Sequence, residues 1–309
     1  MRIYATGASG FIGAHVAREL RLRGGDVRTE RVDLLDRKGL ERAVDGCEAV
    51  VHVAALYSYD ASPELIERVN VEGTRNVIEA CLRKGVRRLL HTSTSGTCGP
   101  VRGRSATEAD APPLWELAVP YKRTKLAAEQ LVLAAARNGL DALVVNPTSP
   151  VGPGDQKPTP TGRMIAGVAT GRIRFYLGNF GLNVVDVRDV ARGHALVLER
   201  GRTGERYILG GTDLKLEELF ARIADLAWRP RPRLRLPYAL AVAAARLGVA
   251  NKNEVRLAQL PLYFSSAKAQ RELGYAPGPI QAALAEAVRE VLKRQVGERG
   301  ALGAVAAAE

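Results

Sequence analysis

The chain has few cysteines, few aromatic residues and no long hydrophobic run, and each shortage excludes a class of protein. Its three cysteines are scattered with no CxxC pair, which argues against a disulfide framework or a zinc site, so no metal is expected. Aromatic residues make up 5% of the chain, too few for a base-stacking platform, so no nucleic-acid partner is expected.

The longest apolar stretch runs from Tyr238 to Ala250 and is interrupted by Arg246. It is shorter than the ~20 residues that span a bilayer, so no integral membrane segment is expected and the stretch is predicted to be a buried helix. The N-terminus has no basic region followed by an apolar core, so no signal peptide is expected and a cytoplasmic location is predicted.

What the sequence does have is 46% hydrophobic residues and a formal net charge of +12 over 309 residues. The hydrophobic content is enough for a buried core. The charge could attract nucleic acid or an anionic membrane surface, but the arginines are spread along the chain rather than packed in one block. Two interpretations stay open: a proteome rich in arginine, or a positive field that draws in an anionic cofactor and substrate.

Short apolar runs alternate with longer helical patterns through the first two thirds of the chain. The expected strands are Ile3–Ala5, Ala49–Ala54, Val86–Thr92 and Leu140–Val145. The expected helices are Ile12–Arg23, Glu64–Lys84 (with Ser62 as N-cap, Pro63 at the first position and Gly85 at the end) and Tyr121–Arg137. This alternation predicts an α/β fold with a doubly wound parallel sheet and right-handed connections.

Three glycines stand where the first strand meets the first helix, in the stretch TGASGFIG. Among Gly7, Gly10 and Gly13, one glycine permits a tight turn, another lets a pyrophosphate approach the backbone, and a third lets the helix pack closely on the strand. The helix N-terminus offers free N–H groups and a partial positive charge to phosphates. The motif therefore predicts a dinucleotide-binding, Rossmann-type domain.

Tyr121 and Lys125 are four residues apart, so they share one face of the predicted helix and can reach the same pocket. Lowering a tyrosine pKa by about three units from ~10 takes about 4 kcal/mol, and one ammonium ~4 Å away supplies roughly that much at an effective dielectric of ~20. Hydroxyls from Thr92 to Ser95 end the preceding strand, where doubly wound sheets place their chemistry. The alternative interpretation is an exposed Tyr–Lys pair and a cluster of turn-capping hydroxyls.

The chain resembles the extended short-chain dehydrogenase/reductases over nearly its whole length. The motifs that carry the resemblance are TGASGFIG, VVHVAA, NVEGTRNVIEAC, HTSTSGTCG, YKRTKLAAEQ, NPTSPVGPGD and VVDVRDVARGHALVLE. Within this family it looks most like hopanoid-associated sugar epimerases and dihydroflavonol-reductase-like enzymes, through KPTPTGRMIAG, GERYILGG and FSSAKAQRELGY. The resemblance implies an NAD(P)-binding Rossmann domain at residues 1–147 and a small C-terminal substrate-binding lobe at 148–309, with about 183–200 returning to the first domain.

The resemblance also implies site residues. Thr94, Tyr121 and Lys125 match the catalytic positions, and Asn70 matches a buried structural asparagine. The implied cofactor contacts are Gly7, Gly10, Phe11, Ile12, Gly13, Arg28, Asp33, Leu34, Ala54, Ala55, Thr92, Ser93, Tyr121, Lys125 and Pro147. The implied substrate contacts are Thr94, Ser95, Asn146, Lys157, Arg163, Asn183 and Arg188.

Three departures from the family pattern matter. The cluster at Thr92–Thr94 reads Thr-Ser-Thr rather than the Thr-Asp-Glu of the related sugar dehydratases, which disfavours elimination of water. Thr94 replaces the commoner serine but keeps the hydroxyl, so activity is expected to survive. Between Gly25 and Asp33 only DVRTERV remains, about fifteen residues fewer than in most relatives and enough to remove a helix.

The cofactor choice depends on that short interval. Arg28 and Arg31 are suited to a 2′-phosphate because guanidinium matches phosphate geometry, whereas Glu30 suits a free ribose hydroxyl. The alternative is that these charges only solvate a turn. NADP is favoured slightly over NAD.

The predicted function is an NAD(P)-dependent nucleotide-sugar epimerase, in which Tyr121 takes a proton while hydride moves to and from the nicotinamide. The same triad also suits an NADPH-dependent carbonyl reductase, and a cofactor-binding regulator without turnover is the third possibility. Relatives pair the helices at Glu64–Lys84 and Tyr121–Arg137 across a two-fold axis, so a homodimer is expected.

Overall fold

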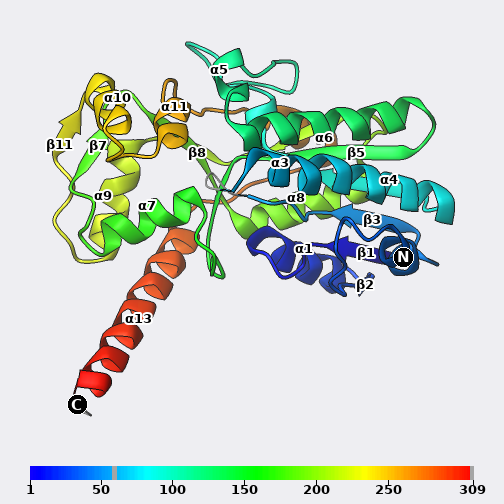
Figure 1. The fold of residues 1–309 in the computed structure, drawn as a ribbon, viewed down its shortest axis with the longest axis horizontal. Coiled ribbons are helices and arrows are strands. Elements are labelled where there is room, and N and C mark those ends of the chain that lie inside the picture. The colour runs from blue at the N-terminus through cyan, green and yellow to red at the C-terminus, as the bar shows by residue number, and fades with distance from the viewer. Residues whose placement is uncertain (58–60, 307–309) are drawn as a thin grey trace.

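A six-stranded parallel sheet forms the centre of the N-terminal part of the protein (Figure 1). The computed structural model describes residues 1–57 and 61–306, with side chains through 295. In spatial order the strands are β2 (Asp26–Arg28), β1 (Arg2–Thr6), β3 (Ala49–His52), β4 (Arg88–Thr92), β5 (Asp141–Pro147) and β9 (Arg206–Leu209). The strand order reverses between β1 and β3, so the sheet is doubly wound and the predicted fold class is confirmed.

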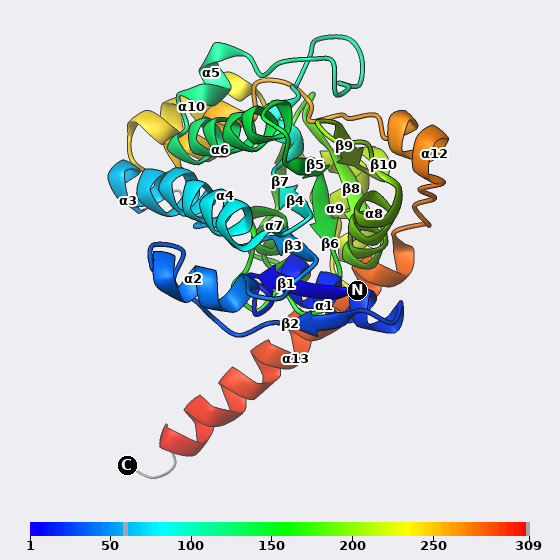
Figure 2. The ribbon, with the colours of Figure 1, turned by 90° about the vertical axis from the view of Figure 1, so that its right-hand side faces the viewer.

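Helices cover both faces of this sheet (Figure 2). One face packs against α1 (Phe11–Leu22) and α8 (Val187–Arg200) through a core that includes Val16 and Val190. The other face packs against α2 (Arg37–Val44), α4 (Gly73–Lys84) and α6 (Pro120–Arg137). Every strand residue of β3 is buried, as expected for a strand covered on both sides.

The first segment of the helix after β3 is capped as the sequence predicts. The Ser62 hydroxyl accepts a hydrogen bond from the Leu65 N–H at the start of α3 (Pro63–Glu67). A single π-helical turn, η1 (Arg68–Glu72), then continues into α4, which ends at Gly85 in the left-handed conformation. The interval after β2 holds no helix before α2, as the short sequence there predicts.

The C-terminal lobe has its own sheets and core. A three-stranded sheet contains β10 (Thr212–Lys215), β8 (Gly181–Asp186) and β6 (Ser149–Val151), and a two-stranded sheet pairs β7 (Phe175–Leu177) with β11 (Leu234–Leu236). Its remaining helices include α7 (Pro160–Ala169), α9 (Leu216–Leu226) and α13 (Gln281–Ala306), which share an apolar core with β8. Asp186 ends β8 and caps α8, so the chain passes at this point from the lobe back to the central sheet.

The remaining elements are short. A 3₁₀ turn, η2 (Ser95–Thr97), follows β4, and α5 (Leu114–Leu117) precedes α6. The elements α10 (Tyr238–Arg246), α11 (Lys252–Leu257) and α12 (Ala267–Leu273) lie between β11 and α13 in the chain.

One prediction about α10 is wrong. The stretch Tyr238–Ala250 is helical in its first part, but Ala245 is its only buried residue. Alanine side chains bury little area, so an alanine-rich helix gains little from reaching the core. Over the described residues, the structure contains no helix with both the length and the apolar character that crossing a bilayer requires.

Candidate active site

The glycine turn after β1 is built by close backbone contacts. Gly7 has φ +70°, and a Cβ on it would lie 2.6 Å from the Ala54 nitrogen. A Cβ on Gly13 would overlap the Gly7 carbonyl oxygen, and the Gly10 N–H donates to that same oxygen at 2.9 Å. Larger side chains at Gly7 and Gly13 would push apart the turn, α1 and the end of β3.

The N-terminus of α1 is open to an anion. Gly10 is the N-cap and offers no side chain, and the first turn carries no acidic residue. The first N–H groups of a helix have no partner within the helix, so those of Phe11 and Ile12 are positioned for phosphate oxygens. The backbone of this turn therefore fits the diphosphate of a dinucleotide.

A buried polar chain fixes the loop that faces this turn. The Thr6 hydroxyl accepts from the Val53 and Ala54 N–H groups, each at 3.1 Å, and contacts His52 Nδ1 at 2.8 Å. His52 Nε2 lies 3.1 Å from the Thr74 hydroxyl. Because that hydroxyl donates to the Asn70 carbonyl oxygen at 2.6 Å, His52 Nε2 must be the donor, and Nδ1 accepts from Thr6.

His52 is held neutral for this role. Burial, and secondarily the charge of Lys125, lower its pKa to about 3. The same chain continues through Asn70, whose side chain bonds both the N–H and the carbonyl of Leu56 and donates to the Thr124 hydroxyl. The end of β1, the Ala54–Leu56 loop and the first turn of α6 are thus tied together.

Tyr121 and Lys125 project from the first two turns of α6. Lys125 is 2% exposed, and its ammonium donates to the Thr92 carbonyl oxygen at 2.7 Å. Burial lowers the pKa of Lys125 to about 8, against an opposing effect of Glu129. Tyr121 is half-buried, and its ring meets the Tyr57 ring edge-on with 4.4 Å between centroids.

Thr94 lies two residues after the end of β4, as the N-cap of η2. Its hydroxyl oxygen accepts from the Gly96 N–H at 3.3 Å, and its residue is half-buried. Two turns of α6 and one strand end therefore supply the three predicted catalytic side chains. A tyrosine, a buried ammonium and a hydroxyl in this setting can exchange a proton with an alcohol or carbonyl oxygen.

The neighbouring predicted contacts differ in what they expose. His194 Nδ1 bonds the Val190 carbonyl oxygen at 2.8 Å, so its Nε2 accepts from the Thr92 hydroxyl at 2.9 Å, and burial lowers the pKa of His194 to about 4. Thr92 thus turns its side chain to α8 and its carbonyl to Lys125. The Ser93 hydroxyl oxygen is buried and has no hydrogen-bond partner in the described structure, which fits a polar cofactor group. Pro147, at the end of β5, is buried.

The predicted adenosine end lies along β2 and the start of α2. The Arg28 guanidinium pairs with the Glu30 carboxylate at 2.6 Å and donates to the Asp45 carbonyl oxygen at 3.2 Å. Asp33 is exposed and accepts from the Leu35 N–H, whereas Leu34 is buried against Gly73. Ala55, in the loop after β3, is half-buried.

Asn146 and Ser95 are buried behind Thr94. The Asn146 amide nitrogen donates to the Thr94 carbonyl, to the Thr97 hydroxyl and to Glu129, at 3.1, 2.9 and 2.9 Å. Glu129 also pairs with Arg206 at 3.0 Å. This network fixes the segment after β4 from the side of α6 and β9. Sequence reasoning missed Glu129 and Arg206 because the two residues are far apart in the chain and no local motif links them.

The remaining predicted substrate contacts have separate partners. Arg163 pairs with Glu254 at 2.6 Å, and Lys157 is exposed in the loop before α7. Asn183 is buried and bonds Asp213, Gly211 and Phe264. Arg188 pairs with Asp186 and Glu286.

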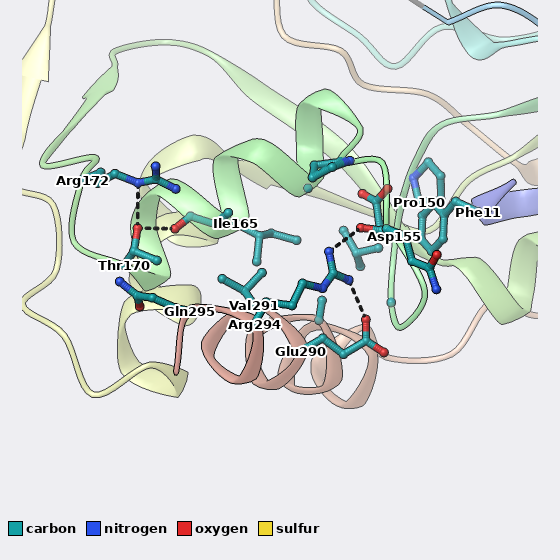
Figure 3. Close-up of a pocket in the computed structure, with 17 residues that line it drawn as sticks. Phe11, Pro150, Asp155, Ile165, Thr170, Arg172, Glu290, Val291, Arg294 and Gln295 are labelled. Carbon is teal, nitrogen blue, oxygen red and sulfur yellow. Dashed lines mark hydrogen bonds and ion pairs between the residues drawn. The ribbon is translucent and has the colours of Figure 1, made fainter. Parts of the chain in front are cut away.

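A cavity of about 450 Å³ lies between α7, α13 and the loop after β6 (Figure 3). Phe11, from the glycine turn, reaches its wall beside Pro150 and Asp155. Arg294 crosses it between the Asp155 carbonyl oxygen and Glu290. None of Lys157, Arg163, Asn183 and Arg188 lines this cavity.

The fold and the site define a dinucleotide-dependent enzyme with a tyrosine–lysine pair. The NAD dependent epimerase/dehydratase family matches residues 3–210, and the chain belongs to this family, within the extended short-chain dehydrogenase/reductases. It binds NAD or NADP. The predicted family and enzyme class are confirmed.

Relatives of this chain include both reductases and epimerases. A putative dihydroflavonol 4-reductase from Synechocystis is 34% identical, over 92% of this chain and 93% of its own length. The crystal structure of gox2253 is 37% identical with a TM-score of 0.84, over 94% of this chain and 98% of that one. A nucleoside-diphosphate-sugar epimerase from Pseudomonas aeruginosa is 28% identical with a TM-score of 0.80, over 94% and 96%.

Proposed function

We propose that the chain is an NAD(P)H-dependent carbonyl reductase, the second of the functions that the sequence suggests. The observation that carries this choice is that most of the lobe residues expected to bind a sugar nucleotide already have partners within the protein. Arg163 and Arg188 are paired with carboxylates, Asn183 is fully bonded inside the lobe, and Lys157 lies in an exposed loop. A diphosphate needs cations free to turn toward it, whereas a carbonyl substrate needs only the triad.

Two groups of this chain act on the substrate in the proposed reaction, and Lys125 acts through the cofactor and Tyr121. Bound nicotinamide supplies the hydride. The Thr94 hydroxyl orients the carbonyl oxygen, and the Tyr121 hydroxyl donates the proton as the alcohol forms. Lys125 would hold the nicotinamide ribose, and its positive charge favours the deprotonated form of Tyr121 once the proton has left. The buried chain from Thr6 to Asn70 keeps the cofactor loop and α6 in register.

For the cofactor we propose NADP over NAD, with Arg28 as the phosphate contact. Its guanidinium is partly exposed, and Arg28 lies opposite Tyr4 of β1 in the strand register. Glu30 competes for it, which makes the preference modest.

A nucleotide-sugar epimerase is the second candidate, because a solved structure described as such an epimerase shares the fold over nearly its whole length. In that case hydride would return to the other face of the same carbon and no cofactor would be consumed. A non-catalytic regulator is disfavoured because Thr94, Tyr121 and Lys125 all keep positions suited to chemistry.

The reductase proposal is tested with purified protein, NADPH and a panel of ketones and aldehydes, read as loss of absorbance at the nicotinamide band. We expect stoichiometric oxidation of NADPH with at least one carbonyl class. Interconversion of nucleotide sugars without net oxidation would select the epimerase instead. Retained cellular function in a folded Tyr121→Phe variant would select the regulator.

From the family resemblance we also propose a homodimer that pairs α4 and α6. The same resemblance carries our proposals of a cytoplasmic location and of the domain limits 1–147 and 148–309, with about 183–200 returning to the first domain. Leu82 on α4 is 57% exposed, which leaves apolar area for such a contact. Light scattering of the purified protein measures the mass, and a monomeric mass contradicts the proposal.

A further inference from the structure

Two arginine-rich segments lie side by side at the outer end of the C-terminal lobe. Two segments, 171–180 and 226–237, together called the β7–β11 edge here, contain six arginines and no aspartate or glutamate: Arg172, Arg174, Arg229, Arg231, Arg233 and Arg235. In Figure 1, β7, β11 and α10 lie on the side of the C-terminal lobe that faces away from the central sheet. The edge is therefore separate from the active site.

Pairing of the two strands places apolar side chains among these arginines. β7 and β11 run parallel with Phe175 opposite Leu234. Their side chains are 46% and 61% exposed. Because the strands run in the same direction, the arginines that precede Phe175 and those that precede Leu234 lie at the same end of the pair. The edge thus combines apolar area with several cations.

Trp228 is the clearest sign that this edge serves something outside the fold. It is 94% exposed, and its φ is +53°, in the region that favours glycine. It follows the C-cap of α9, where its N–H bonds the Asp225 carbonyl and the Arg229 N–H bonds the Ala224 carbonyl. Glycine is the usual residue at this position of a helix end. A large aromatic side chain here contributes nothing to packing and favours an external partner.

Aliphatic side chains continue from the edge. β11 leads directly into α10, and Leu240, Leu247 and Val249 are 55%, 80% and 80% exposed. Arg231 pairs with Asp225, and Arg235 donates to Asn179. Arg229 and Arg233 form no hydrogen bond or ion pair with the residues that the structure describes, so two cations are available to a partner.

We propose that the β7–β11 edge and α10 bind peripherally to an anionic lipid surface. Arginine pairs with lipid phosphate, tryptophan prefers the interface between headgroups and acyl chains, and exposed aliphatic side chains gain by leaving water. Nucleic acid would match the arginines and the aromatic rings but offers nothing to Leu240, Leu247 and Val249. An acidic protein would match the charge but does not explain a tryptophan in a conformation that favours glycine.

The test is sedimentation of the full-length protein with vesicles of phosphatidylcholine alone or of phosphatidylcholine and phosphatidylglycerol in equal parts. We expect binding to the anionic vesicles and little to the neutral ones. Trp228→Gly should reduce partitioning about tenfold. Since glycine suits the backbone there, its thermal stability should equal or exceed that of the wild type, so lost binding is not lost folding.

Matched variants separate charge from apolar contact. Arg229→Gln with Arg233→Gln should lower binding to anionic vesicles by about 25-fold at low salt. Leu22→Ser and Arg18→Gln, exposed positions on α1, are the controls and should bind as the wild type does. No vesicle binding, equal loss in the α1 controls, or binding to single-stranded nucleic acid that Trp228→Gly weakens while vesicle binding stays unchanged would each overturn the proposal.

Discussion

The central sheet and the C-terminal lobe differ in how they place polar and apolar side chains. Around the sheet, polar side chains are buried and mostly bonded, as in the chain through Thr6, His52 and Asn70. In the lobe, several arginines are exposed, and apolar side chains such as Trp228 and Leu247 face solvent. The comparison shows that buried hydrogen bonds fix the polar side chains around the sheet, whereas the lobe leaves several charged and apolar side chains exposed to solvent.

The largest effect is expected at Lys125, whose charge is buried for function. Lys125→Met should lower kcat/KM by about 10²-fold or more, because the cofactor and Tyr121 lose the ammonium. The same change should also stabilise the fold by roughly 2 kcal/mol at pH 7. Removing the buried ammonium, whose pKa is about 8, relieves the native state of roughly 3 kcal/mol, and losing its hydrogen bond to Thr92 costs about 1 kcal/mol.

The stability advantage of Lys125→Met over the wild type should shrink as the pH rises. The folded pKa of Lys125 lies below the unfolded value, so the native state binds fewer protons between about pH 8 and ~10.4, and the wild type is stabilised relative to Lys125→Met as pH rises through this window. Denaturant unfolding at pH 7 and pH 10 checks it. An advantage of the variant that is equal at both pH values would contradict the buried charge.

The second effect compares two neighbouring buried histidines. The rings of His52 and His91 lie 5.2 Å apart, yet His52 bonds two hydroxyls and neither ring nitrogen of His91 has a hydrogen-bond partner in the described structure. His52→Leu should cost about 2–4 kcal/mol because Thr6 and Thr74 lose their partner, whereas His91→Leu should be neutral or stabilising.

Unfolding curves measure the stabilities of the two variants. Dinucleotide affinity adds a readout of position, because only His52→Leu should weaken it, through Thr6 and the Ala54 N–H. Equal destabilisation by the two changes would mean that size, not hydrogen bonding, decides.

Much of the central region could be predicted because its signals are local. The apolar run Ala49–Ala54, the cap at Ser62 and the three glycines each depend on residues close in sequence. The Glu129–Arg206 pair and the tautomer of His52 could not be predicted, because their partners come from distant elements. In the lobe, α10 was predicted to be buried but is largely exposed, because an apolar sequence does not show whether another element covers it.

The third effect concerns cofactor choice at Arg28 and Glu30. Arg28→Ala should reduce the preference for NADPH over NADH about fivefold, because a phosphate loses a guanidinium. Glu30→Gln should raise that preference by a similar factor, since the 2.6 Å ion pair that now holds Arg28 is removed. The ratio of kcat/KM values for the two cofactors measures both. Ratios that do not move would place the 2′ site elsewhere.

The smallest effect is expected in the lobe, at Arg163. Its guanidinium and the Glu254 carboxylate are about half exposed, so Arg163→Gln should change stability by less than about 1 kcal/mol. Its kcat/KM with a carbonyl substrate should stay within about twofold. A rise in KM of tenfold or more for a nucleotide sugar would instead support the epimerase hypothesis and the predicted role of Arg163 as a substrate contact.

Net hydride transfer at Tyr121 is tested most directly by a single turnover with NADPH deuterated at the transferred position. One deuterium should appear in the product alcohol for each NADPH oxidised, and Tyr121→Phe should slow this step about 10³-fold without unfolding the protein. Product that carries no deuterium, or nicotinamide that returns to its reduced form after turnover, would contradict the account.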